Sequence, residues 1–192
     1  MTKIIQDGQN IDSDIKTALT IGNFDGVHLG HQYLIQKTIE IAKKNGLSSA
    51  VITFRENSRK ILKKSQNLKT ILNIDEKIKS LSQLKPDYIL VLEFNQDLAN
   101  FSAREFIQNI LIKQCKMSQL VVGEDFALGK NREGNLKTLK NLSKELEFGF
   151  SVIKKLKISD KIPSSSLIRE LIIQKDSENI SKLLGRKMKL DD

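Results

Sequence analysis

Cysteine, tryptophan and long apolar runs are scarce or missing in this chain of 192 residues, and each absence excludes a class of protein. With one cysteine, Cys115, the chain cannot form an internal disulfide, and we interpret that side chain as part of the core. The longest aliphatic run, Tyr88–Leu92, is far too short to span a bilayer, and the first residues lack the apolar stretch of a signal peptide. We therefore expect a soluble cytoplasmic protein with no membrane partner.

Basic residues outnumber acidic ones, 32 to 23, which gives a formal net charge of +9. Such an excess is typical of proteins that bind nucleic acid. Here the lysines are spread along the chain among acidic residues, and basic residues do not alternate with aromatic ones as in a base-stacking surface. We therefore expect a lysine-rich solvated surface and no nucleic-acid partner, although the field would also attract small polyanions such as nucleotides.

Short apolar segments alternate with amphipathic ones, which is the pattern of strands and helices in an α/β fold. The expected strands are 17–21, 50–54, 88–94, 120–123 and 148–153. The expected helices are 31–45, 74–84, 102–114, 136–146, 165–174 and 177–184. Because the strands are rich in Val, Ile and Leu and are separated by helices, they predict a doubly wound parallel sheet in one domain, residues 1–192.

The only two histidines, His28 and His31, lie three residues apart in a glycine-rich turn between an expected strand and helix. Gly26 and Gly30 let phosphate oxygens approach the main chain, and the N–H groups of a helix start favour an anion. Imidazoles add hydrogen-bond donors with or without charge. The turn therefore predicts a nucleotide phosphate site; a metal site or incidental surface histidines are the alternatives.

Each of two further clusters could bind a ligand or could have a purely structural role. Residues 123–134 include three glycines, a carboxylate, Phe126 and Arg132, so the ring could face a planar ligand or simply anchor the loop. Three serines at 164–166 precede Arg169 at an expected helix start, where they could hold phosphate or cap the helix. Because ligands bind at the carboxyl ends of parallel strands, we expect the loop at 22–30, the segment after Phe54 and the loop at 123–134 to line one crevice.

Taken together, the three clusters resemble the motifs of one protein family, the FMN adenylyltransferase (FAD synthetase) module of bacterial bifunctional riboflavin kinase/FAD synthetases. The motifs are Gly22-x-Phe24-Asp25-Gly26-x-His28-x-Gly30-His31, Gly123-x-Asp125-Phe126-x-x-Gly129-x-x-Arg132-x-Gly134 and Ser164-Ser165-Ser166-x-Ile168-Arg169. The stretches Ile74-Asp75-Glu76-Lys77 and Leu183-Leu184-Gly185-Arg186 are also similar to the family. The resemblance covers nearly the whole chain.

The resemblance implies a Rossmann-like fold of the HxGH nucleotidyltransferase type and the reaction of ATP with FMN to give FAD and pyrophosphate, with Mg²⁺. The metal ligands are unknown. The resemblance assigns catalysis to His28, His31 and Arg169. It assigns ATP binding to Gly22, Phe24, Asp25, Gly30, Ser164, Ser165 and Ser166. It assigns flavin binding to Phe54, Asp125, Phe126, Gly129 and Arg132. The FMN phosphate is largely ionised at neutral pH, so the reaction needs no general base.

Two departures from the family qualify these expectations. The chain stops six residues after Arg186, where the family continues with a riboflavin kinase, so we expect a separate riboflavin kinase to supply FMN. The segment Arg55-Glu56-Asn57-Ser58 stands where the family often has a Pro-His-Pro type segment, on the crevice side of the sheet. Two other functions stay open: a nucleotidyltransferase with another phosphorylated acceptor, and a non-catalytic flavin or nucleotide sensor. Asp25 could touch the nucleotide or the metal, or brace the turn.

Overall fold

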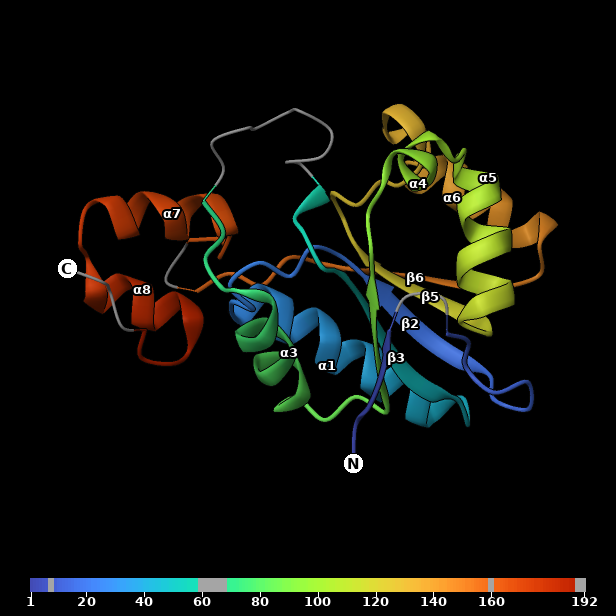
Figure 1. The fold of residues 1–192 in the computed structure, drawn as a ribbon, viewed down its shortest axis with the longest axis horizontal. Coiled ribbons are helices and arrows are strands. Elements are labelled where there is room, and N and C mark those ends of the chain that lie inside the picture. The colour runs from blue at the N-terminus through green and yellow to red at the C-terminus, as the bar shows by residue number, and fades with distance from the viewer. Residues whose placement is uncertain (7–8, 59–68, 159–160, 189–192) are drawn as a thin grey trace.

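A parallel sheet forms the centre of the computed structural model, which describes residues 1–6, 9–58, 69–158 and 161–188 (Figure 1). Within these ranges, six strands pair in the order β1-β4-β3-β2-β5-β6, and every pairing is parallel. The strands are β1 (Lys3–Gln6), β2 (Thr17–Ile21), β3 (Ser48–Phe54), β4 (Tyr88–Leu92), β5 (Met117–Gly123) and β6 (Gly149–Ile153). The predicted doubly wound parallel α/β sheet is confirmed, with β2 at the point where the strand order reverses.

Helical segments connect the strands, and several begin at the side chains that the sequence favours as caps. They are α1 (Leu29–Lys44), α3 (Ile74–Ser82), α4 (Gln96–Asn100), α5 (Ala103–Glu105), the π-helix η1 (Phe106–Gln114), the 3-10 helix η2 (Lys130–Arg132), α6 (Leu136–Glu145), α7 (Ser165–Ile173) and α8 (Ser177–Leu184). Asn73 and Glu76 form a capping box at α3, as do Ser102 and Glu105 at α5. None of these described helices is long and apolar enough to cross a membrane.

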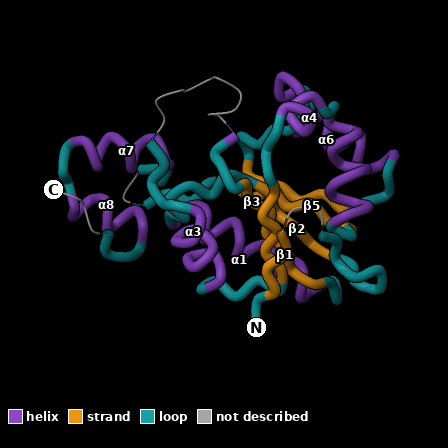
Figure 2. The backbone as a smooth tube through the Cα atoms, viewed as in Figure 1, coloured by secondary structure: helices purple, strands orange, loops and turns teal. Residues whose placement is uncertain are grey.

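The helices cover both faces of the sheet, which explains why β2 and β4 are buried along their whole length. On one face, Val51 and Ile89 pack with residues of α1 and α3. On the other face, Leu19 and Ile52 pack with residues of α5, η1 and α6. Figure 2 shows the strands as the central layer between these two groups of helices. This arrangement places the loops after the strands at the carboxyl edge of the sheet.

The C-terminal helix pair, α7 and α8, does not cover the sheet but forms a smaller cluster of its own. Its buried members are Ile71, Ile168, Leu171, Ile180, Leu183 and Leu184. In Figure 1 the pair lies at one end of the molecule, beside α1 and α3, whereas α4 to α6 lie at the other. The pair therefore reaches the sheet mainly through the turn that carries the two histidines.

The expected elements differ from the structure at several ends and in three omissions. The omitted elements are β1, which has a single buried residue at the sheet edge, the short α4 and the 3-10 helix η2. The expected helix at 31–45 begins at Leu29, because His28 is its N-cap. The expected single helix at 102–114 is α5 followed by the π-helix η1. The remaining differences are at element ends: β3 begins at Ser48, β4 ends at Leu92, β5 begins at Met117 and β6 begins at Gly149, while α1, α3, α6 and α7 end at Lys44, Ser82, Glu145 and Ile173.

Candidate active site

The turn between β2 and α1 contains backbone that most residues avoid. Phe24 and Val27 have φ of 46° and 40°, in the left-handed region, and Gly26 has φ of 84°. For a β-branched residue such as Val27 this conformation is rare and strained. Both non-glycine side chains are buried, which supplies packing energy that offsets the strain. The turn therefore has one defined shape, determined by its surroundings.

The two histidines are adjacent, stacked and neutral at neutral pH. Their ring centroids lie 3.6 Å apart with 20° between the planes, and His28 Nδ1 accepts a hydrogen bond from His31 N at 3.2 Å. Burial, followed by the positive charge of Arg186, lowers the pKa of His28 to about 4. The pKa of His31 is lowered well below 6.5, mainly by burial and to a smaller extent by the neighbouring His28. Because Nδ1 of His28 is an acceptor, the proton of its neutral ring is on Nε2, which is then a hydrogen-bond donor.

Phe24 supports the histidines rather than standing open to a ligand. Its ring is 2% exposed and packs edge-on against His31, with centroids 5.2 Å apart and 86° between the planes. Gly22 lies against the same ring, because a Cβ on Gly22 would be 3.2 Å from Phe24 Cζ. On the other side of the pair, His31 Nδ1 is buried and finds no hydrogen-bond partner among the described residues. A bound ligand or water could satisfy this atom.

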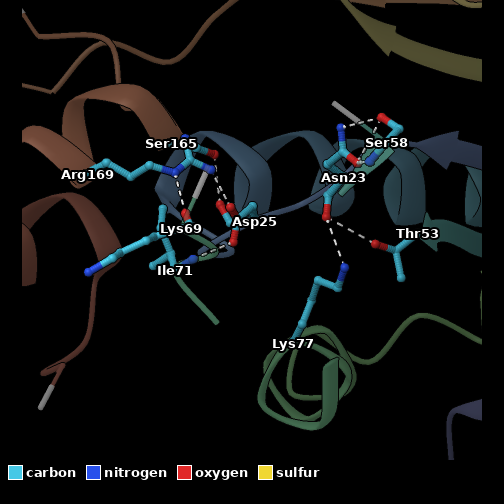
Figure 3. Close-up of polar contacts among 9 residues, drawn as sticks. All are labelled: Asn23, Asp25, Thr53, Ser58, Lys69, Ile71, Lys77, Ser165 and Arg169. Carbon is cyan, nitrogen blue, oxygen red and sulfur yellow. Dashed lines mark hydrogen bonds and ion pairs between the residues drawn. The ribbon is translucent and has the colours of Figure 1, made fainter. Parts of the chain in front are cut away.

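Asp25 braces the turn by joining three parts of the chain (Figure 3). Its carboxylate is buried, accepts a hydrogen bond from Ile71 N at 2.9 Å and forms an ion pair with Arg169. Arg169 Nε also donates to Lys69 O at 2.9 Å, and Ser165 Oγ donates to Asp25 O at 2.8 Å. Of the three roles left open for Asp25, these contacts support bracing. The assigned role of Arg169 in phosphate binding stays a prediction.

The start of α7 lies beside the start of α1. A Cβ on Gly30 would be 3.1 Å from the His28 ring and 3.4 Å from Pro163 O, so no larger residue fits between them without a shift. Ser164 caps α7 by accepting a hydrogen bond from Leu167 N at 3.2 Å, and Ser166 is exposed. Two helix N-termini therefore meet at the histidines, which is favourable for an anion.

The loop after β3 contacts the histidine turn, and a crevice shared with the loop at 123–134 stays a prediction. Asn23 Oδ1 accepts a hydrogen bond from Ser58 N at 3.0 Å, and Thr53 Oγ1 donates to Asn23 O at 3.2 Å (Figure 3). Ser58 belongs to the segment that departs from the family, so this segment supports the turn through Asn23. Phe54, assigned to the flavin, is buried and packs edge-on against Phe94, with ring centroids 5.3 Å apart.

Lys77 is a member of this site that the sequence analysis did not single out. Its side chain is buried, and Nζ donates to Phe54 O at 2.5 Å and to Asn23 O at 3.4 Å. Burial lowers the pKa of Lys77 to about 8, against the opposing effect of Asp25. Nothing in the local sequence distinguishes this lysine from its many exposed counterparts. The one indication in the sequence is that Lys77 ends the stretch 74–77, which is similar to the family.

The loop at 123–134 contacts residues of α5 and of the segment after β6. Gly129 has φ of 76°, and a Cβ there would lie 2.6 Å from Ala103 N. Arg132 donates to Asp125 O at 3.0 Å, and Asp125 forms an ion pair of 3.1 Å with Lys155. The partly buried Phe126 packs against the main core, which supports the anchoring alternative for this ring. Because β5 is next to β2, this loop starts from the same sheet edge as the histidine turn.

Residues 10–167 match the family model described as FAD synthetase. The chain is 37% identical over 171 residues to a bifunctional riboflavin kinase/FMN adenylyltransferase of Buchnera aphidicola subsp. Schizaphis graminum (strain Sg), which covers 88% of this chain and 55% of that protein. It is 33% identical over 176 residues to the protein of the same description from Bacillus subtilis (strain 168), covering 91% and 55%. The chain therefore spans about half the length of the curated relatives it matches.

A solved structure extends the likeness from sequence to fold. It is described as a macrolide-efflux protein from Streptococcus pneumoniae and superposes with a TM-score of 0.82 at 26% identity. The match covers 97% of this chain and 62% of that one.

Proposed function

Because the chain belongs to the FAD synthetase family, we propose that it is an FMN adenylyltransferase, which forms FAD and pyrophosphate from ATP and FMN. The observation that carries the proposal is the neutral pair His28 and His31 at the junction of the α1 and α7 N-termini. There the helix dipoles and free N–H groups favour the phosphates, and the imidazoles supply donors without fixed charge.

The reaction is an in-line displacement at the α-phosphorus of ATP. An oxygen of the FMN phosphate forms the new bond to phosphorus, and the bond between that phosphorus and the bridging oxygen of pyrophosphate breaks. The second pKa of a phosphate monoester is about 6, so the nucleophile is largely ionised at neutral pH. No proton needs to be removed from the nucleophile. Catalysis then depends on positioning and on stabilising charge in the transition state.

We assign that stabilisation to the histidine pair. The Nε2–H of His28 is the donor left after Nδ1 accepts the hydrogen bond from His31 N. His28 is buried and His31 is partly buried, and burial lowers both pKa values, so the neutral imidazoles donate without needing a proton from solvent. A contact of Arg169 with the triphosphate would use Nη1, because Lys69 O and the Asp25 carboxylate engage Nε and Nη2.

Magnesium fits this site as part of the substrate. Among residues 1–6, 9–58, 69–158 and 161–188, no group of three or more His, Cys, Asp or Glu side chains could hold a metal ion. Mg²⁺ commonly keeps several waters and binds through substrate phosphates with one or two carboxylates. We therefore propose that Mg²⁺ arrives on ATP, where it neutralises phosphate charge, and we assign it no protein ligand.

The flavin and the source of FMN complete the proposal. The loop at 123–134 and Phe54 stay predicted flavin contacts, supported by their place at the carboxyl edge of the sheet. A separate riboflavin kinase, a cytoplasmic location, a single domain over 1–192 and the lack of a nucleic-acid partner also stay predictions.

An FAD-formation assay tests the proposal. The purified protein is incubated with ATP, Mg²⁺ and either FMN or riboflavin, and the flavins are separated by chromatography. We expect FAD from FMN and none from riboflavin, and we expect His31→Ala to lower turnover far more than it weakens FMN binding. ATP binding without FAD formation would favour another phosphorylated acceptor. Binding of both nucleotides without any turnover would favour a sensor.

A further inference from the structure

Arg186, which follows the last helix, contacts the turn immediately before the first histidine. Its Nη2 donates to Gly26 O at 2.7 Å and its Nη1 donates to Val27 O at 3.1 Å. These oxygens belong to the peptide groups on either side of the Val27 Cα. One guanidinium therefore fixes both peptide planes around the strained residue that precedes His28.

The position of Arg186 is itself determined by the packing of α8 against α1. Gly185 ends α8 with φ of 68°, and a Cβ there would lie 2.7 Å from Leu29 Cδ2. Gln32 Nε2 donates both to Leu184 O at 2.8 Å and to Val27 O at 2.9 Å. The end of α8 and the start of α1 therefore share hydrogen bonds. Arg186 is held at the turn and is not a freely moving surface side chain.

We propose that Arg186 is a positioning residue for adenylyl transfer, which orients the His28 side chain by holding the two peptide groups that flank Val27. This inference rests on the proposed function of the site. Arg186 is not needed to attach the turn to the C-terminal helices, because Ser165 and Arg169 already hold Asp25. Its loss should therefore disturb the geometry before His28 more than the fold.

Electrostatics supports the same role. Arg186 is the charged group that lowers the pKa of His28, in addition to burial. Glu76 at the start of α3 acts on Arg186 and opposes the effect of burial, which lowers the pKa of the guanidinium. His31, the other titratable group in contact with His28, is itself held neutral by burial. Arg186 therefore stabilises the neutral form of His28 as well as its place.

The test compares Arg186→Met and Arg186→Lys with Lys187→Met, the adjacent exposed cation, as the matched control. The chain has only two histidines, so NMR titration of the ligand-free protein can follow both imidazoles. In Arg186→Met we expect the His28 pKa to move toward 6.5, turnover to fall about tenfold or more and the KM for FMN to stay within about twofold. Arg186→Lys should recover part of the pKa effect but little turnover, because an ammonium lacks the planar fork.

The outcomes separate this inference from the proposed function. If the unaltered protein makes no FAD, the proposed function fails, and the titration still measures the link between Arg186 and His28. If folded Arg186→Met keeps the His28 titration and turnover of the control, the inference is overturned. It is also overturned if turnover falls only in proportion to lost folded protein, measured by thermal unfolding. If Arg186→Met does not fold, the His28 titration and the turnover of Arg186→Lys decide instead.

Discussion

The buried neutral state of His28 predicts that the protein loses stability in mild acid. The pKa of His28 is about 4 in the folded protein against 6.5 for the unfolded chain. Between these values the unfolded chain binds a proton that the folded chain does not, so the free energy of unfolding falls as the pH falls. Each pH unit below 6.5 is worth about 1.4 kcal/mol, so His28 lowers the free energy of unfolding by about 2 kcal/mol between pH 7 and pH 5, nearly all of it below pH 6.5. His31 acts in the same direction, because its pKa is also lowered.

Urea unfolding at pH 7, 6 and 5, extrapolated to water, measures this loss. The matched variant is His28→Asn, because an asparagine oxygen at the N-cap can accept the hydrogen bond that His28 Nδ1 accepts from His31 N. We expect His28→Asn to lose about 2 kcal/mol less than the unaltered protein over the same pH range.

Two results would contradict this reasoning. One is an unaltered protein that is as stable at pH 5 as at pH 7. The other is a folded His28→Asn variant that keeps the full pH dependence, which would move its origin away from His28. Above pH 7 the histidine effect should be absent in both proteins, because both states are then neutral at these side chains.

Three further predictions concern the brace, the loop and the buried lysine. Arg169→Ala should lower the free energy of unfolding, measured in urea, by about 3 kcal/mol, because the buried Asp25 carboxylate loses its cationic partner. Adding Asp25→Asn should recover part of this loss, and no recovery would argue against coupling between the two side chains. Gly129→Ala should lower Tm more than Gly46→Ala, since both have positive φ but only the first would place a Cβ 2.6 Å from a backbone nitrogen; equal shifts would contradict that contact. The pKa of Lys77 is lowered to about 8, so between pH 8 and 10 the unfolded chain binds more protons. The stability of the unaltered protein relative to Lys77→Met should therefore rise by about 2 kcal/mol over that range, and a flat difference would refute it.

The family and the general fold could be predicted because their signals are local in the sequence. Strand and helix periodicity, the capping residues Asn73 and Ser102 and the spacing of His28 and His31 each depend on neighbouring residues. The alternation of strands and helices then restricted the topology to a parallel sheet, which the structure confirms. The family match over residues 10–167 confirms the predicted family.

Elements with weak local signals were missed. β1 has one buried residue and pairs only with β4, so its strand conformation depends on a partner far along the chain. The π-helix at 106–114 has the same apolar character as an ordinary helix, and its hydrogen-bond pattern is not visible in the sequence. Periodicity alone therefore predicted a single regular helix there.

The local sequence identifies the residues of the histidine turn, but the contacts that hold the turn depend on tertiary packing. Asp25 and Arg169 are 144 residues apart, and Gly26 and Arg186 are 160 apart, so no local pattern relates them. The pKa values of His28 and Lys77 likewise depend on burial and on charges from other elements. Residue type determines which hydrogen bonds are available, but their partners and the local dielectric exist only after the chain has packed.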